Sequence, residues 1–294
     1  MRTMTALIRR EYLEHRGAFL YAPATVLLLV TLAFGTAVLL NKVRVPYEIG
    51  ATSALKFFEV GFLGMGALWF LYLTVALFFY YADAFSADRR NNSMYFWKSM
   101  PVSDFTVLSS KMLAGMTLLP GLIFAALIAS GVILYGLTGL AVVMMPRLEI
   151  PGVTDVLLSS LQLGFYALVY LVLALLWYAP FYAWVGALST VVRRWSIPLA
   201  FLIPGMVGLV ENLFFYGAGP RGGYVLGFLR RRLEFGPDHD NMEVELLRAL
   251  SADSGAMLQS LLASIDWAQL AGGLIFAALA VYAASEYRRR VIST

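Results

Sequence analysis

Six long apolar runs constrain the fold of this chain more than any other feature of its sequence. They occupy residues 19–41, 61–82, 107–136, 161–187, 195–216 and 267–285. Crossing the hydrocarbon of a bilayer takes roughly 20 apolar residues, and every run has about that length. A helix of a soluble domain has no reason to be apolar all round over such a distance. The runs therefore predict an all-α integral membrane protein with six transmembrane helices.

The composition agrees with a single membrane domain over residues 1–294. Only 14% of the residues are charged, whereas soluble domains carry about 25%. The six runs and their connections use most of the chain, which leaves no room for a separate soluble domain. There is no cysteine, so disulfides, thiolate metal sites and cysteine nucleophiles are excluded.

The basic residues predict the orientation of the chain. The N-terminal stretch, the 83–106 and 188–194 connections and the C-terminal tail are arginine-rich, whereas the other connections dilute their basic residues with acids. The positive-inside rule places the first group in the cytoplasm, and both termini with it. Residues 1–18 are also amphipathic: Met4, Leu7, Ile8 and Tyr12 share one face, with Arg9, Arg10, Glu14 and Arg16 on the other. We expect an interfacial helix on the cytoplasmic leaflet, the alternative being a solvated basic lead-in.

The extracytoplasmic connection 217–266 is the longest in the chain. Loops of this length are usually functional or separately structured, so we expect short or re-entrant helices on the outer face before the last span. Glu211 and Asn212 lie just before it, inside the fifth run. A charge inside a membrane favours a functional role, here a pathway or outer gate. A carboxylate at the interface, ionised or protonated, is an equal alternative.

The sequence lacks the residues that most enzymes need. No phosphate-binding GxxxxGK[ST] motif occurs, and the chain has only two histidines, His15 and His239, on opposite sides of the predicted membrane. These absences exclude the usual nucleotide cradle, histidine-based metal sites and a histidine-dependent triad in the membrane. We expect a non-catalytic chain with no bound cofactor or metal and no nucleic-acid partner.

The 83–106 connection is the most structured-looking polar segment, and here the chain resembles the ABC-2 type permeases, membrane subunits of ATP-driven exporters. The resemblance rests on the amphipathic lead-in, six spans with both termini inside, and the stretch ADRRNNSMYFWKSMPVSDFTVLSSKM. Family members commonly show an acidic-basic start, an aromatic-Lys-Ser-x-Pro-Val-Ser core and a lysine that opens span three. Lys111 is the lysine at that place here. The resemblance is specific over about residues 83–112.

The resemblance implies a partner ATPase that binds ATP and Mg²⁺, a second permease copy, surrounding lipid, and a bacterial cytoplasmic (inner) membrane. A helix in the connection would dock on the ATPase and transmit its motion. The residues implied in this coupling are Asp88, Arg89, Arg90, Tyr95, Phe96, Trp97, Lys98 and Pro101. Aromatic and arginine side chains dominate interface energetics, although the aromatics also suit the lipid headgroup region.

Two other functions remain open from the sequence. An ion-driven secondary transporter would need acids near mid-span and broken helices around them, and Glu211 is the one candidate that we identify. A non-transporting membrane scaffold or assembly factor also fits the lack of catalytic residues. The transported substrate has no signature in the sequence.

Overall fold

The computed structural model describes residues 2–40, 42, 54–90, 102–144, 151–192, 195–214, 223–233, 235 and 254–291. The regular elements of this part of the chain are helices: α1 (Arg2–Arg16), the π-turn η1 (Gly17–Tyr21), α2 (Ala22–Leu39), α4 (Ala54–Arg90), α6 (Asp104–Met116), α7 (Leu118–Met144), α8 (Val153–Val192), α9 (Ser196–Phe214), α10 (Tyr224–Leu233), α12 (Ser254–Ser264) and α13 (Trp267–Val291).

Six helical stretches are long and apolar enough to cross a membrane, as the sequence predicts. They are Thr3–Leu39, Leu55–Asp88, Asp104–Leu140, Val153–Val192, Ser196–Phe214 and Trp267–Arg290. The helices extend beyond the apolar runs because helical hydrogen bonding continues through polar residues at their ends. Residues 83–90 of the predicted 83–106 connection are therefore the last turns of α4, and only its later part connects α4 to α6.

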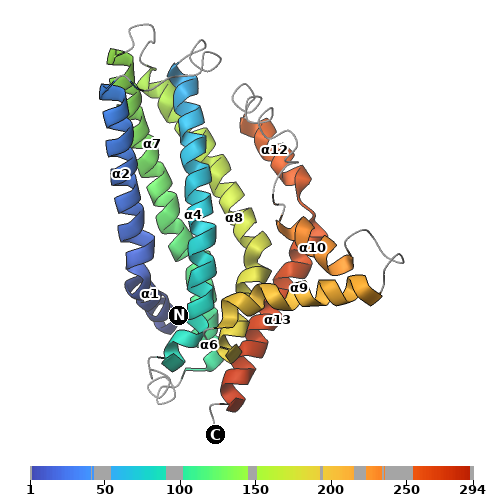
Figure 1. The fold of residues 1–294 in the computed structure, drawn as a ribbon. Coiled ribbons are helices and arrows are strands. Elements are labelled where there is room, and N and C mark those ends of the chain that lie inside the picture. Colours follow the sequence, from blue (N-terminus) through green and yellow to red (C-terminus); the bar gives the residue numbers. More distant parts are fainter. Residues whose placement is uncertain are drawn as a thin grey trace.

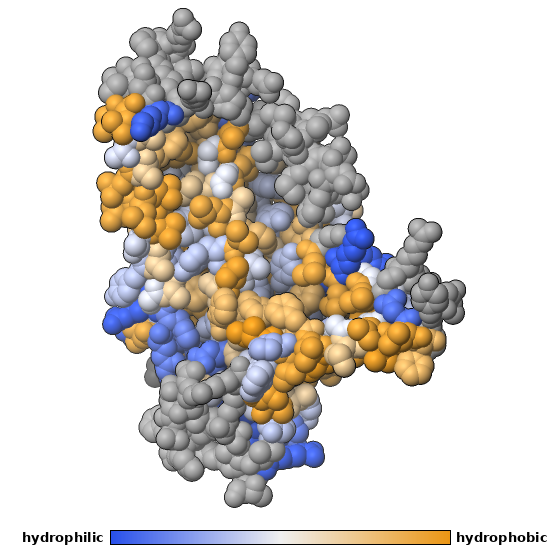
Figure 2. All heavy atoms as spheres, in the orientation of Figure 1, coloured by the Kyte–Doolittle hydropathy of each residue, from blue (hydrophilic) through white to orange (hydrophobic). Residues whose placement is uncertain are grey.

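The long helices form a bundle with both chain termini at one end. Figure 1 shows α2, α4, α7 and α8 side by side, with α13 beside the C-terminal half of α8. Large aromatic side chains fill the interior, among them Phe58, Phe62, Trp69 and Tyr81. Figure 2 shows hydrophobic surface over α2 and α9. Such surface suits contact with lipid, because a soluble protein rarely exposes large apolar patches.

α9 lies across the bundle instead of along it (Figure 1). Its first turns pack against the C-terminal ends of α4 and α8, where Ala82, Val185 and Ala200 form a small buried cluster. The rest of α9 projects away from the bundle, and Phe201, Leu213 and other apolar side chains along it are exposed. These first turns are where α9 contacts α4 and α8, and hydropathy does not record such contacts.

A proline explains the bend between α1 and α2. The N–H of Ala22 donates to the carbonyl of Gly17, an i→i+5 bond that defines the π-turn. The same pattern would next pair the carbonyl of Ala18 with residue 23, but Pro23 has no N–H. The hydroxyl of Tyr72 on α4 donates to the carbonyl of Ala18 instead. The bend is therefore stabilised by a neighbouring helix.

A serine cap and a break shape the third span. The Oγ of Ser103 accepts the N–H of Thr106 at 3.2 Å, so Ser103 caps the start of α6. The helix is interrupted at Thr117 between α6 and α7. Pro120 lies just after this break, where a proline without an N–H donor is best tolerated.

Candidate functional site

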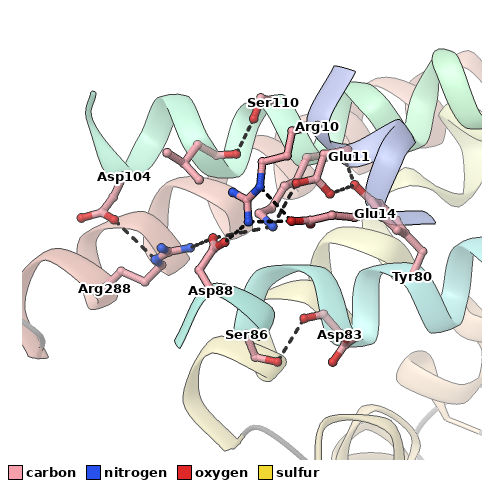
Figure 3. A network of polar contacts seen from close by, with 12 residues as sticks. Arg10, Glu11, Glu14, Tyr80, Asp83, Ser86, Asp88, Asp104, Ser110 and Arg288 are labelled. Carbon is pink, nitrogen blue, oxygen red and sulfur yellow. Dashed lines mark hydrogen bonds and ion pairs between the residues drawn. The ribbon is translucent and has the colours of Figure 1, made fainter. Parts of the chain in front are cut away.

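A buried ionic cluster joins four helices at the end of the bundle that carries both termini (Figures 1 and 3). α1, α4, α6 and α13 each contribute to it, although these helices are far apart in sequence. We define the ionic cluster as Arg10, Glu11, Asp88, Asp104, Lys111 and Arg288. Four of its members, namely Glu11, Asp88, Lys111 and Arg288, are at most 3% exposed.

Asp88 is the centre of the cluster. Its Oδ2 lies 3.6 Å from Lys111 Nζ and 3.5 Å from Arg288 Nη1. Its Oδ1 lies 3.5 Å from Arg10 Nη2. One carboxylate on α4 therefore faces cations from three other helices. Figure 3 shows the Arg10 and Arg288 side chains converging on it.

Glu11 supplies the second buried carboxylate, on the helix that leads into the first span. Its Oε1 lies 3.1 Å from Lys111 Nζ, and its Oε2 accepts a 3.0 Å hydrogen bond from the hydroxyl of Tyr80. That hydroxyl also lies 3.1 Å from the carbonyl oxygen of Lys111. The contacts bind α1 to both α4 and α6.

The cluster extends to the start of α6 through Arg288. Its Nε lies 3.4 Å from Asp104 Oδ1, so this guanidinium bridges Asp88 and Asp104. These two carboxylates flank residues 91–101, which lie outside the described part of the chain. The two described carboxylates on either side of that segment therefore pair with the same buried charge on α13.

Buried charges of this kind make the arrangement strongly cooperative. Removing one member of a buried ion pair costs about 3–5 kcal/mol, because the other charge is left without compensation. Each carboxylate here faces cations from other helices, so a displacement of one helix end disturbs the pairing of the rest. The cluster is suited to transmit movement between helices, since Asp88, Lys111 and Arg288 at its centre are at most 3% exposed.

The predicted coupling residues fall into three groups. Asp88 is 1% exposed and contacts cations of its own chain, so its carboxylate has an internal role. Arg89 and Arg90 end α4. The remaining residues, Tyr95, Phe96, Trp97, Lys98 and Pro101, lie outside the described part, and their role stays a prediction.

Glu211 caps a helix. Its Oε1 accepts the N–H of Tyr224 at 2.6 Å, and its Oε2 accepts the N–H of Val225 at 2.8 Å. These are free N–H groups at the start of α10, where a carboxylate is stabilised by the helix dipole. The side-chain amide of Asn212 donates to the carbonyl of Gly208 within α9. Glu211 therefore joins α9 to α10.

Arg232 fastens the other end of α10 to the bundle. Its guanidinium is 1% exposed and lies 4.4 Å from the Trp177 ring centroid. It donates to the carbonyl oxygens of Trp177 on α8 and Gln269 on α13. Burial lowers the pKa of Arg232, while the nearby Asp266 carboxylate opposes that shift. We call α10, with these two anchors, the strap.

Several of these residues escape sequence reasoning, for different reasons. Glu11 leaves a usable signal, because it falls on the apolar stripe of Met4, Leu7 and Ile8 at helical spacing. Glu59 lies outside the second apolar run, residues 61–82, but α4 begins earlier and includes it. Its Oε1 accepts a 2.7 Å hydrogen bond from Ser159 on α8. Arg288 and Arg232 belong to basic triplets that give no sign of which member is buried.

Three side chains on α1 have the spacing of a metal site, but the carboxylates among them already pair with cations. One ligand atom each from Glu11, Glu14 and His15 lies within 4.8 Å of the others. Lys111 Nζ already neutralises Glu11 at 3.1 Å, and Arg10 pairs with Glu14 at 2.7 Å. Both carboxylates are therefore already paired with cations of the chain, which lowers their tendency to bind a metal ion.

Comparison with protein-family models, with curated proteins and with solved structures found no match to this chain.

Proposed function

We propose that this chain is the permease subunit of an ABC-2 type exporter. In this role it sits in a bacterial cytoplasmic membrane with both termini inside, pairs with a second permease copy, and takes its energy from a separate ATPase that holds ATP and Mg²⁺. The observation that carries the proposal is the buried ionic cluster, which ties both ends of the 91–101 segment to four helix ends. A segment that receives force from a partner needs such a rigid base.

The position of Glu211 favours this proposal over an ion-driven carrier. Transport ions bind to carboxylates that are accessible from a pathway and free to change partners. Both carboxylate oxygens of Glu211 instead accept backbone N–H groups of α10. The acid that the sequence offers as the best ion site therefore has a structural task.

Affinity purification from the native membrane in mild detergent tests the proposal directly. An ATPase chain at near-equal stoichiometry, with vanadate-sensitive hydrolysis, is the expected result. A chain that purifies reproducibly alone and without hydrolysis contradicts it, and an ion-driven carrier or a scaffold then becomes the better interpretation.

A double variant tests the coupling role of the 91–101 segment. Phe96→Ala with Trp97→Ala removes two apolar anchors, and we expect at least a tenfold loss of ATPase association with the bundle still folded. Phe201→Ala with Phe214→Ala is the matched control, because both of these aromatics are exposed on α9, at 67% and 79%. Unchanged association in the first variant, or equal loss in both, contradicts the coupling role.

A further inference from the structure

An apolar groove runs between α2, α4 and α7, away from the ionic cluster. Its volume is about 210 Å³. Eleven side chains line it: Leu27, Val30, Thr31, Phe34, Gly61, Gly64, Met65, Ser130, Ile133, Leu134 and Leu137. The lining spans about 10 Å along α2 at 1.5 Å per residue, which fits within the roughly 15 Å of hydrocarbon in one leaflet.

Two contacts join α2 and its lead-in to α4 near the groove and on the side of the π-turn. Near the groove, Phe34 on α2 packs against Phe57 on α4, with ring centroids 6.5 Å apart. On the side of the π-turn, the hydroxyl of Tyr72 on α4 donates to the carbonyl of Ala18, the acceptor that Pro23 leaves free. Both contacts hold α4 against the first span and the turn that leads into it.

The two hydroxyls that line the groove already donate their hydrogens within the protein. Thr31 Oγ1 donates to the carbonyl of Leu27 in its own helix. Ser130 Oγ donates to the carbonyl of Ala126 and accepts the indole N–H of Trp69 at 2.8 Å. A buried water needs two to four polar partners, so water is a poor occupant. An apolar molecule is the occupant that this lining favours.

A glycine opens the groove to its surroundings. Gly64 is exposed, and a Cβ added there would meet no atom within 4 Å. The neighbouring Gly61 differs, because its added Cβ would lie 2.7 Å from Leu134 Cδ2. Gly61 therefore allows close packing with α7, whereas Gly64 leaves an accessible space between spans.

We propose that this groove binds one acyl chain of a membrane phospholipid. Size decides between the apolar candidates. A helix with its side chains is about 10–12 Å across, and pockets for drug-sized ligands begin near 300 Å³. The drug-sized volume exceeds the roughly 210 Å³ of this groove, and a helix is at least as wide as the lined stretch of α2 is long, whereas a single hydrocarbon chain is narrow enough to enter. The proposal is independent of the transport function.

Native mass spectrometry of the full chain, purified from its membrane in mild detergent, tests this site. We expect one retained phospholipid on the unmodified chain, less on Gly64→Ala, and at least a fivefold reduction on Gly64→Leu, which fills the groove. Gly139→Leu is the control, because Gly139 lies on the opposite face of α7 and its added Cβ also meets no atom within 4 Å. Val30→Phe fills the groove from α2 if Gly64→Leu fails to fold.

Photo-crosslinking in vesicles locates the bound chain. A phosphatidylcholine with a diazirine in its acyl chain should label residues of the groove, and the Gly64→Leu variant should lose that label at least fivefold. Retention of lipid and label at the unmodified level in Gly64→Leu overturns the proposal. So does equal loss in Gly139→Leu. A change in the mass of the assembly instead of its lipid content identifies a second copy as the occupant and also overturns it.

Discussion

Asp88 shows how much of this bundle depends on single charges. In Asp88→Asn the amide keeps the shape of the side chain but removes the negative charge that faces Lys111 and Arg288. Lys111 still faces Glu11 and Arg288 still faces Asp104, so the two buried cations lose part of their compensation. We therefore expect a loss of about 3 kcal/mol in the free energy of unfolding, the lower end of the range for a broken buried pair. Thermal unfolding in detergent, followed by tryptophan fluorescence, measures the change.

Glu286 provides the matched control for this experiment. It lies on α13, like Arg288, but pairs with Arg289 and Arg290, whose side chains are 74% and 77% exposed. Surface pairs contribute little to stability, so Glu286→Gln should leave the melting temperature close to that of the unmodified chain. An equal loss in both variants would show that Asp88 has no special internal role.

The Arg232 side chain holds α10 against α8 and α13, and a lysine in its place tests that role. Arg232→Lys keeps the charge but loses the planar fork that reaches two carbonyl oxygens and stacks on Trp177. We expect the amides of residues 224–233 to exchange hydrogen at least tenfold faster, as measured by mass spectrometry. Arg231→Lys is the control, because Arg231 is exposed on the same turn. Unchanged exchange in Arg232→Lys contradicts the role of the strap.

At the scale of helices, the sequence predicts which helices form better than it predicts where they end and how they are oriented. Length and hydropathy identify the six membrane-length helices because burial in lipid demands apolar side chains over a fixed distance. The same measures miss the ends of α4, since residues 83–90 are polar and still helical. They also miss the direction of α9, which depends on contacts of its first turns with α4 and α8.

We expect Pro23 to maintain the bend between α1 and α2. In Pro23→Ala the restored N–H can pair within the helix, so the π-turn should relax and the carbonyl of Ala18 should release Tyr72. Because the chain has no cysteine, spin labels at Thr3 and Leu39 report the bend directly. Their separation should lengthen toward the roughly 54 Å of an unbroken helix, 36 residues at 1.5 Å each. An unchanged separation would show that the bend has another cause.

Across the whole molecule, the groups that sequence reasoning misses are those joined over the longest separations. Asp88 and Arg288 are 200 positions apart, and Trp177 and Arg232 are 55 apart. No periodicity links such pairs, because a pattern along one helix carries no information about the facing helix. Two groups of long-range contacts therefore hold the helices together, the ionic cluster and the strap. α9 contacts the rest of the fold through its first turns and through the strap.

The direction of α9 gives a prediction for the whole molecule in its membrane. If the bilayer normal follows α4 and α8, the two ends of α9 lie at similar depth, unlike the ends of a spanning helix. Spin labels at Trp195 and Leu213, which are 68% and 71% exposed, should show similar accessibility to oxygen and to a water-soluble nickel complex in vesicles. Labels at Tyr21 and Leu39 bracket α2 and should differ in depth from each other. A depth difference across α9 as large as that across α2 would mean that α9 crosses the membrane, and that the fastening by the strap yields when the bundle is embedded in lipid.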